Sequence, residues 1–112
     1  MKWLQLIKVF AAHAVWSLTN RSTAGRIVVS SLSSPDENVR TIAGMLIVKR
    51  GKAALPLLRE ALGSRHALTM VLPILGDIGS ASAAIDVAQF VGDSDATVDK
   101  AARAALILLK VK

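Results

Sequence analysis

The apolar residues of this chain recur with helical spacing along most of its length. Val39, Ala43 and Leu46, for example, are three or four positions apart and therefore fall on one face of a helix. Similar runs are separated by short turns that contain glycine, serine or aspartate. The pattern predicts an all-α fold with seven helices, at residues 3–19, 22–32, 35–50, 52–62, 65–78, 80–91 and 95–110.

The helical segments themselves repeat, with a period of about 29 residues. The segment "SPDENVRTIAGMLIVK" aligns with "DSDATVDKAARAALILLK", and both begin with an acidic turn. Between them, "HALTMVLPILGDIG" carries leucine in the same phase and ends at Gly79, where the earlier unit has Gly51. Such a period is typical of stacked helix pairs that share one core. We expect a single domain over residues 1–112, with units at about 3–32, 34–63, 64–92 and 94–112.

The turn "SPDENVR", the residues Ala43 and Leu46, Gly51 and the segment "AALPLLREAL" together resemble a HEAT repeat. The resemblance is closest to the short HEAT-like repeat of phycobilisome lyases, and it is strongest at residues 34–63. The third unit departs from the pattern, because it lacks the acidic turn and the Val-Arg pair. The resemblance implies an α-α superhelix, a short right-handed solenoid of antiparallel helix pairs.

The turn before the helix predicted at residues 35–50 contains residues that favour a helix start. We expect Ser34 to be the N-cap, Pro35 to occupy the first helical position and Glu37 to complete a capping box. The resemblance to HEAT-like repeats implies that aspartate and arginine side chains near such turns join adjacent units. We assign this structural role to Asp36, Arg40 and Asp95.

The composition supports a packed helical core without cysteine chemistry. Hydrophobic residues make up 53% of the 112 residues, and cysteine is absent, which excludes disulfides, thiolate metal sites and a cysteine nucleophile. We therefore expect a reducing, cytoplasmic location. Lys8 and His13 interrupt the apolar run near the start, so we expect no transmembrane segment and no secretory signal there.

The sequence contains no catalytic constellation and no cofactor motif. His13 and His66 have no second histidine or carboxylate at helical spacing, as a metal site or general base requires. The acidic segment "GDSDATVD" does not fit a calcium-binding EF-hand loop, because Val98 and Ala104 stand where that loop needs glycine and glutamate. We expect no metal, no cofactor and no enzymatic activity.

The net charge of +6 is concentrated in the first part of the chain. Residues 1–66 contain ten Lys or Arg and three acidic residues, a net charge of +7. Residues 67–112 contain four Lys or Arg and five Asp, a net charge of −1. A basic half makes nucleic-acid binding the first alternative function, with the candidate residues Arg21, Arg26, Lys49, Lys52 and Arg59. Against it, the third unit places Asp86, Gln89 and Phe90 where a continuous basic groove would need cations.

Our leading hypothesis is a non-catalytic scaffold or interaction module that binds another protein, whose identity the sequence does not specify. One candidate surface is the inner face of the predicted solenoid, with Lys52, Arg59, Gln89 and Phe90. A second alternative function, implied by the resemblance alone, is a subunit of a tetrapyrrole (bilin) lyase-like assembly. The residues specify no bilin site.

The other candidate surface is the helix predicted at residues 3–19, at the end of the stack. One face collects Trp3, Ile7, Phe10, Ala14 and Leu18, and a second apolar edge is formed by Val9 and Trp16. Because an end helix needs a polar outer face to stay solvated, we expect this second edge to bind a partner or to mediate self-association. The alternative is that the segment at residues 20–25 folds back over Trp16.

Overall fold

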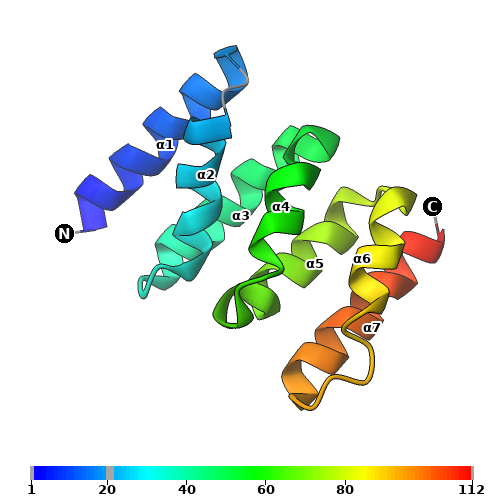
Figure 1. Ribbon diagram of the computed structural model, residues 1–112. Coiled ribbons are helices and arrows are strands. Elements are labelled where there is room, and N and C mark those ends of the chain that lie inside the picture. Colours follow the sequence, from blue (N-terminus) through cyan, green and yellow to red (C-terminus); the bar gives the residue numbers. More distant parts are fainter. Residues whose placement is uncertain (1, 20–21, 112) are drawn as a thin grey trace. The chain divides into compact units, whose positions relative to one another are not determined.

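The computed structural model describes residues 2–19 and 22–111, and every regular element in this part of the chain is helical. It has seven α-helices (Figure 1): α1 Lys2–Thr19, α2 Ser22–Ser30, α3 Glu37–Arg50, α4 Leu55–Ala61, α5 Leu68–Ile78, α6 Ala84–Ala88 and α7 Ala96–Val111. Short 3-10 turns are η1 Ser31–Ser33, η2 Gly51–Ala54, η3 Arg65–Ala67 and η4 Ala81–Ala83. The predicted all-α fold is confirmed. None of the described helices is long and apolar enough to cross a bilayer.

Helices α4, α5 and α6 each begin a few residues later than predicted, after a 3-10 turn. Ser64 and Ser80 precede the turns η3 and η4 with extended backbones, and neither side chain caps the turn. A 3-10 turn satisfies early backbone groups with bonds of shorter range, which compensates for the missing cap. The apolar periodicity therefore located these helices but not their first residues.

The start of α3 differs from the predicted capping box. The helix begins at Glu37 and its N-cap is Asp36, whose Oδ1 accepts a hydrogen bond of 2.8 Å from the backbone N–H of Asn38. Ser34 is extended, with φ −61° and ψ 142°, because the residue before a proline avoids the helical region. Pro35 thus lies before the helix, and Ser34 is too far from its first turn to be the N-cap.

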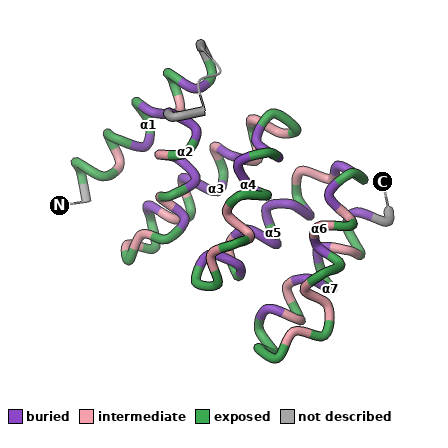
Figure 2. The backbone as a smooth tube through the Cα atoms, in the orientation of Figure 1, coloured by how far each residue is buried: buried purple, intermediate pink, exposed green. Residues whose placement is uncertain are grey.

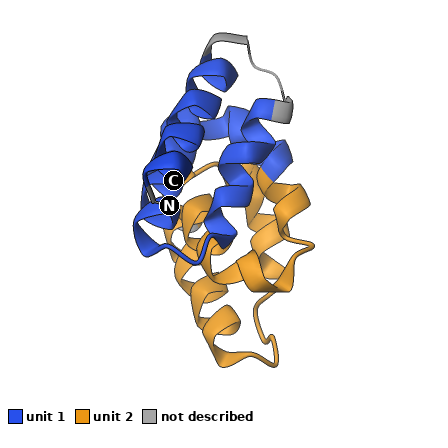
Figure 3. Ribbon diagram, turned by 90° about the vertical axis from the view of Figure 1, so that its left-hand side faces the viewer, with its two compact units in different colours: residues 1–57 blue, residues 58–112 orange. Residues whose placement is uncertain are grey.

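The contacts divide the chain into two compact units, residues 1–57 and 58–112 (Figure 3). The boundary falls inside α4. In the first unit α1 packs against α2 and α3, and in the second α5 and α6 pack against α7. Each unit has its own aliphatic core, and Figure 2 shows the buried positions on the facing sides of these helices. Among the fully buried side chains are Val28, Leu32, Ile47, Leu68, Val71, Leu72 and Leu75.

The closest helix pair of the second unit depends on a glycine. A Cβ atom at Gly76 of α5 would lie 3.0 Å from the Cα of Ala105 on α7. Ala102 and Ala105 are themselves buried, so both helices present small residues to each other. Small residues let two helix backbones approach closely, and this is how the alanine-rich composition contributes to the core.

Candidate functional site

Helix α1 is apolar on two opposite sides, and the first unit buries only one of them. Val9 and Trp16 are both 1% exposed, and Ala12 lies beside them at 7%. These three residues contribute to the core that α1 shares with α2 and α3. The prediction that Val9 and Trp16 form the open edge is therefore wrong: they are the buried face of the helix.

Trp16 is covered by two other helices of its unit. Gly25 of α2 lies so close that a Cβ there would be 2.8 Å from Cε2 of the indole. The guanidinium of Arg50, on α3, lies 4.9 Å from the ring centroid, a cation–π contact. The alternative that the segment after α1 covers Trp16 is thus the one observed, and the cover is a helix rather than a loop.

The opposite side of α1 is exposed, and we call it the outer face of α1. Trp3 is 74% exposed, Leu4 67%, Ile7 59% and Phe10 49%. The outer face consists of Trp3, Leu4, Ile7, Phe10, Ala11, Ala14 and Val15, all of which are exposed. The sequence correctly grouped Trp3, Ile7, Phe10 and Ala14 on one face, but it assigned the wrong face to the partner. The side chain of Leu18, predicted with them, lies outside the described set.

The area of this face is comparable to the largest apolar patch of a typical monomer. An aromatic side chain has a surface of roughly 150–250 Å², and an aliphatic one somewhat less. At the exposed fractions given above, with Val15 at 46%, the five large side chains of the face expose roughly 500 Å² together. The largest apolar patch on a typical monomer covers about 300–600 Å² and is often functional. The outer face of α1 is therefore the strongest candidate for a binding surface among the described residues.

Other residues of α1 line a small pocket of about 200 Å³ in the first unit. Gln5 and Lys8 of α1 line it together with Ser30, Ser31 and Ser34. The hydroxyls of Ser30 and Ser31 both donate to the carbonyl of residue 27 at 2.9 Å, so they are already used within the fold. Lys8, which also lines the pocket, is an exposed cation beside the outer face of α1.

His13 lies at the other edge of α1 and is only partly exposed. Burial lowers its pKa below the ordinary value of 6.5, and the nearby charges of Lys49 and Arg50 lower it further. Its Nε2 is 3.4 Å from the hydroxyl of Ser17, and its Nδ1 has no hydrogen-bond partner among the described residues. Both effects favour the neutral imidazole at pH 7, so the positive charge at this edge of α1 comes from Lys49 and Arg50 rather than from His13.

The predicted inner-face residues are divided between the two units. Lys52 is exposed in η2 of the first unit, whereas Arg59, Gln89 and Phe90 belong to the second. Arg59 is not an isolated cation, because its Nε donates to Oδ2 of Asp86 at 2.8 Å. Gln89 is exposed and Phe90 is half-buried. The charge of Arg59 is thus compensated within its own unit, which weakens it as an anion-binding residue.

The other cations proposed for nucleic-acid binding are distributed over several elements of the chain. Arg26 and Lys49 are exposed on α2 and α3, in the first unit, and Arg21 lies outside the described residues. Arg59 is bound to Asp86 in the second unit. Tracking a phosphate backbone requires several neighbouring cations, so these positions give a nucleic-acid interface no specific structural support.

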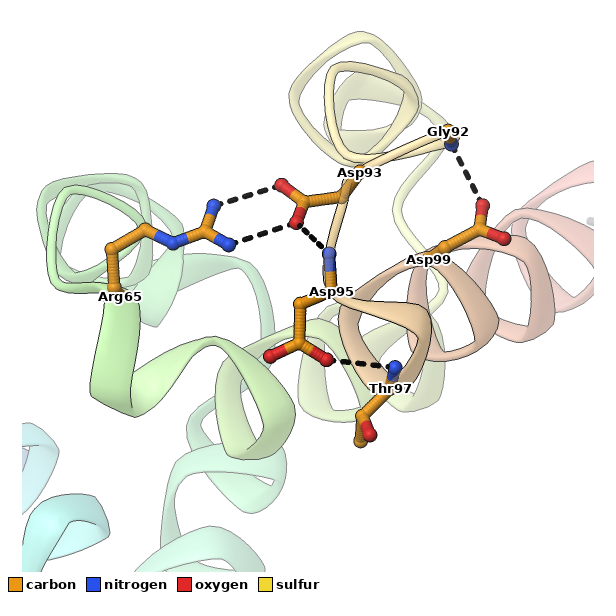
Figure 4. Close-up of polar contacts among 6 residues, drawn as sticks. All are labelled: Arg65, Gly92, Asp93, Asp95, Thr97 and Asp99. Atoms are coloured by element: carbon orange, nitrogen blue, oxygen red, sulfur yellow. Dashed lines mark hydrogen bonds and ion pairs between the residues drawn. The ribbon is translucent and has the colours of Figure 1, made fainter.

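The acidic turn before α7 is a structural joint (Figure 4). Nη1 and Nη2 of Arg65 donate to the two carboxylate oxygens of Asp93, each at 2.8 Å. One of these oxygens also accepts a 2.9 Å bond from the backbone N–H of Asp95. Because Arg65 favours the charged carboxylate most strongly and this backbone bond adds to it, the pKa of Asp93 falls from 3.8 to about 2.

Asp95 and Asp99 accept hydrogen bonds from backbone N–H groups at and before the start of α7. Asp95 is the residue before α7 and accepts from the backbone N–H of Thr97 at 2.9 Å. Asp99 accepts from the backbone N–H of Gly92 at 2.7 Å, and from Arg103. These two bonds, the backbone one first, lower the pKa of Asp99. No group of His, Cys, Asp or Glu in the described part of the chain is arranged to hold a metal ion.

The residues that join distant parts of the second unit are not Asp36, Arg40 or Asp95, to which the sequence assigned this role. Asp36 and Asp95 cap their own helices, and Nη1 of Arg40 donates to the Ser34 carbonyl at 2.8 Å. Arg59 and Arg65 instead reach acids 27 and 28 residues further along the chain. These separations are close to the repeat period of about 29 residues. Opposite charges one period apart were the sequence signal that could have identified both joints.

A scan against models of known protein families, a search of curated proteins and a search of solved structures give no match to this chain. What the fold and the site define is an all-α protein whose first helix presents an exposed apolar face.

Proposed function

We propose that this chain is a helical-repeat module that binds another protein through the outer face of α1. The observation that carries the proposal is the exposure of four large apolar side chains on consecutive turns of one helix: Trp3, Leu4, Ile7 and Phe10. Aromatic residues are enriched in the cores of protein interfaces, and tryptophan is among the residues that contribute most to binding energy there. The opposite side of the same helix is already buried, so the face is fixed in place for a partner.

The repeat character is supported by the charge pairs of the second unit. Arg59–Asp86 and Arg65–Asp93 each connect a residue near one helical turn with an acid 27 or 28 positions later. Stacked repeats place equivalent positions of neighbouring units side by side, so contacts recur at the repeat length. The HEAT-like architecture is part of this proposal, and these two contacts are the structural support for it.

A protein partner suits the outer face better than a nucleic acid does. Seven apolar residues form the face, and Lys8 is the exposed cation at its edge. Nucleic-acid affinity comes largely from cations that neutralise phosphates, and this face provides too few of them. Its chemistry is that of a protein interface with an apolar centre, which favours a partner with an apolar patch of its own.

Affinity capture with chemical cross-linking tests the proposal directly. The bait proteins are the wild-type chain, Ile7→Glu, and the control Ile85→Glu, which changes an isoleucine that is 79% exposed on α6. We expect a protein that is captured by the wild type and by Ile85→Glu but not by Ile7→Glu. A further bait, Lys52→Glu, tests the inner face: partners that bind Ile7→Glu normally and are lost with Lys52→Glu would move the site there. Salt-sensitive DNA binding by the first three baits would favour the nucleic-acid alternative.

A further inference from the structure

The residues of the outer face have the spacing of a helix-pairing seam. Leu4, Ile7, Ala11 and Ala14 are separated by three, four and three positions, and all four are exposed. These three-and-four spacings are those of a heptad pattern, whose period of about 3.5 residues keeps the contact positions of two packed helices facing each other. The seam thus extends over about three turns of α1, since a turn contains about 3.6 residues. Its surface matches a second helix that lies along it.

The bulk along the seam is distributed unevenly. Leu4 and Ile7 are large and Ala11 and Ala14 are small, while the exposed side chains of Trp3, Phe10 and Val15 flank the seam. A second copy in antiparallel orientation would place its small half against the large half of the first. A parallel copy would place bulk against bulk at one end and leave a gap at the other, which close packing disfavours.

We propose that the outer face of α1 pairs with the same face of a second copy of this chain, with the two helices antiparallel. In this arrangement Leu4 packs across from Ala14 of the second copy, and Ile7 packs across from Ala11 of the second copy. The contact is two-fold symmetric, so it closes on itself and gives a dimer rather than a filament. The inference rests on the proposed function, because it names the partner of the same face.

The outer face provides much of the area that such a dimer needs. Buried completely, it would contribute roughly 500 Å² of apolar surface per copy. Stable protein–protein interfaces bury about 800 Å² per partner, of which about 60% is apolar. The apolar part of a standard-size interface is therefore present on α1, and polar residues around the face would supply the rest.

A lipid surface is a weaker match for the same residues. Helices that lie in a membrane interface expose a strongly charged face opposite the apolar one. The side of α1 opposite its outer face consists of Val9, Ala12 and Trp16, which are buried in the first unit. Lipid chains also have no requirement for small residues at regular spacing, whereas a second helix does. The seam therefore favours a helix as the occupant.

Sedimentation equilibrium and light scattering over a range of protein concentrations provide the first test. We expect a concentration-dependent dimer for the wild type and for the control Ile85→Glu. Ile7→Glu should weaken dimerisation roughly a hundredfold or more, because the two-fold axis places two carboxylates in the buried seam. Ile7 is 59% exposed in the single chain, so circular dichroism and urea unfolding should show that this variant is folded.

The orientation is tested by cross-linking, which is simple here because the chain contains no cysteine. Leu4→Cys and Ala14→Cys are prepared separately, mixed, and oxidised under mild conditions. An antiparallel pair brings these two positions together, so we expect mainly the mixed disulfide. Disulfides between two Leu4→Cys chains would indicate parallel helices and overturn the proposed arrangement, since the Cα atoms must approach within about 7 Å.

The remaining outcomes separate this inference from the proposed function. A wild-type chain that stays monomeric at every concentration overturns the dimer. If Ile7→Glu also abolishes capture of a different protein, the binding function stands and only the identity of the partner was wrong. If the monomer instead binds anionic vesicles and Ile7→Glu releases it, the face is a lipid-binding surface and both proposals fail. If Ile7→Glu changes none of these measurements, both proposals fail as well.

Discussion

Gly25 of α2 lies directly against the indole ring of Trp16 on α1. A Cβ atom at position 25 would be 2.8 Å from Cε2 of the ring and 2.5 Å from Cδ1 of Leu57. Real Cβ contacts are essentially never this short, so the absence of a side chain at this position allows α2 to cover the tryptophan. The contact determines which side of α1 is buried and therefore which side is available for binding.

We expect Gly25→Ala to lower the free energy of unfolding by about 1–3 kcal/mol, as overpacking of a core usually does. Alanine favours helix over glycine by about 1 kcal/mol, and we expect the overlap with Trp16 and Leu57 to outweigh this gain. Urea unfolding followed by circular dichroism measures the difference. Gly63→Ala is the control, because the nearest atom to its Cβ would be 3.4 Å away. A Gly25→Ala protein as stable as the wild type would show that Trp16 is not tightly covered.

The two tryptophans report the orientation of α1 by fluorescence. Trp16 is 1% exposed and Trp3 is 74% exposed. In Trp3→Phe the remaining emission should lie at short wavelength and resist quenching by acrylamide, whereas in Trp16→Phe it should lie at long wavelength and be quenched readily. The measurement is made at low concentration, where the proposed dimer dissociates. The opposite order would restore Trp16 as the open edge of the helix.

The Arg65–Asp93 joint should make stability depend on acid pH. The pKa of Asp93 is lowered from 3.8 to about 2, so folding favours its charged form. The contribution is fully present above pH 3.8, and it is lost as the pH falls towards 2. We expect the stability difference between the wild type and Asp93→Asn to shrink over this interval. In carboxyl NMR titrations Arg65→Gln should raise the pKa of Asp93; an unchanged pKa would exclude Arg65 as the main cause.

His13 should also make stability depend on pH, but near neutral pH. Folding favours its neutral form, whereas folding favours the charged form of Asp93. Its pKa is lowered from 6.5, first by burial and then by Lys49 and Arg50, so the unfolded chain binds a proton more readily. Stability should therefore fall as the pH drops below 6.5, until the folded protein is protonated as well. His13→Gln should remove this part of the pH dependence, and Lys49→Gln should raise the pKa of His13 in proton NMR. A pKa of 6.5 or higher in the wild type would contradict the burial described above.

The cap of α3 illustrates how far local sequence rules extend. Serine, proline and acids in "SPDENVR" correctly indicated a helix start, but they allowed more than one capping residue. The proline restricts Ser34 to an extended backbone, and Asp36 then takes the N-cap position. The charge pairs of the second unit were harder to predict, because Arg65 and Asp93 are brought together only by the packing of separate helices.

By itself, the sequence determined that the described chain is helical, roughly where each helix lies, and that the first helix is apolar on two sides. It did not determine which side faces the core, because both sides of α1 satisfy the helical period equally well. That choice depends on residues far along the chain. Gly25 leaves room for the ring of Trp16, and Arg50 stacks on it. The tertiary structure thus buries Val9 and Trp16 and exposes Trp3, Leu4, Ile7 and Phe10.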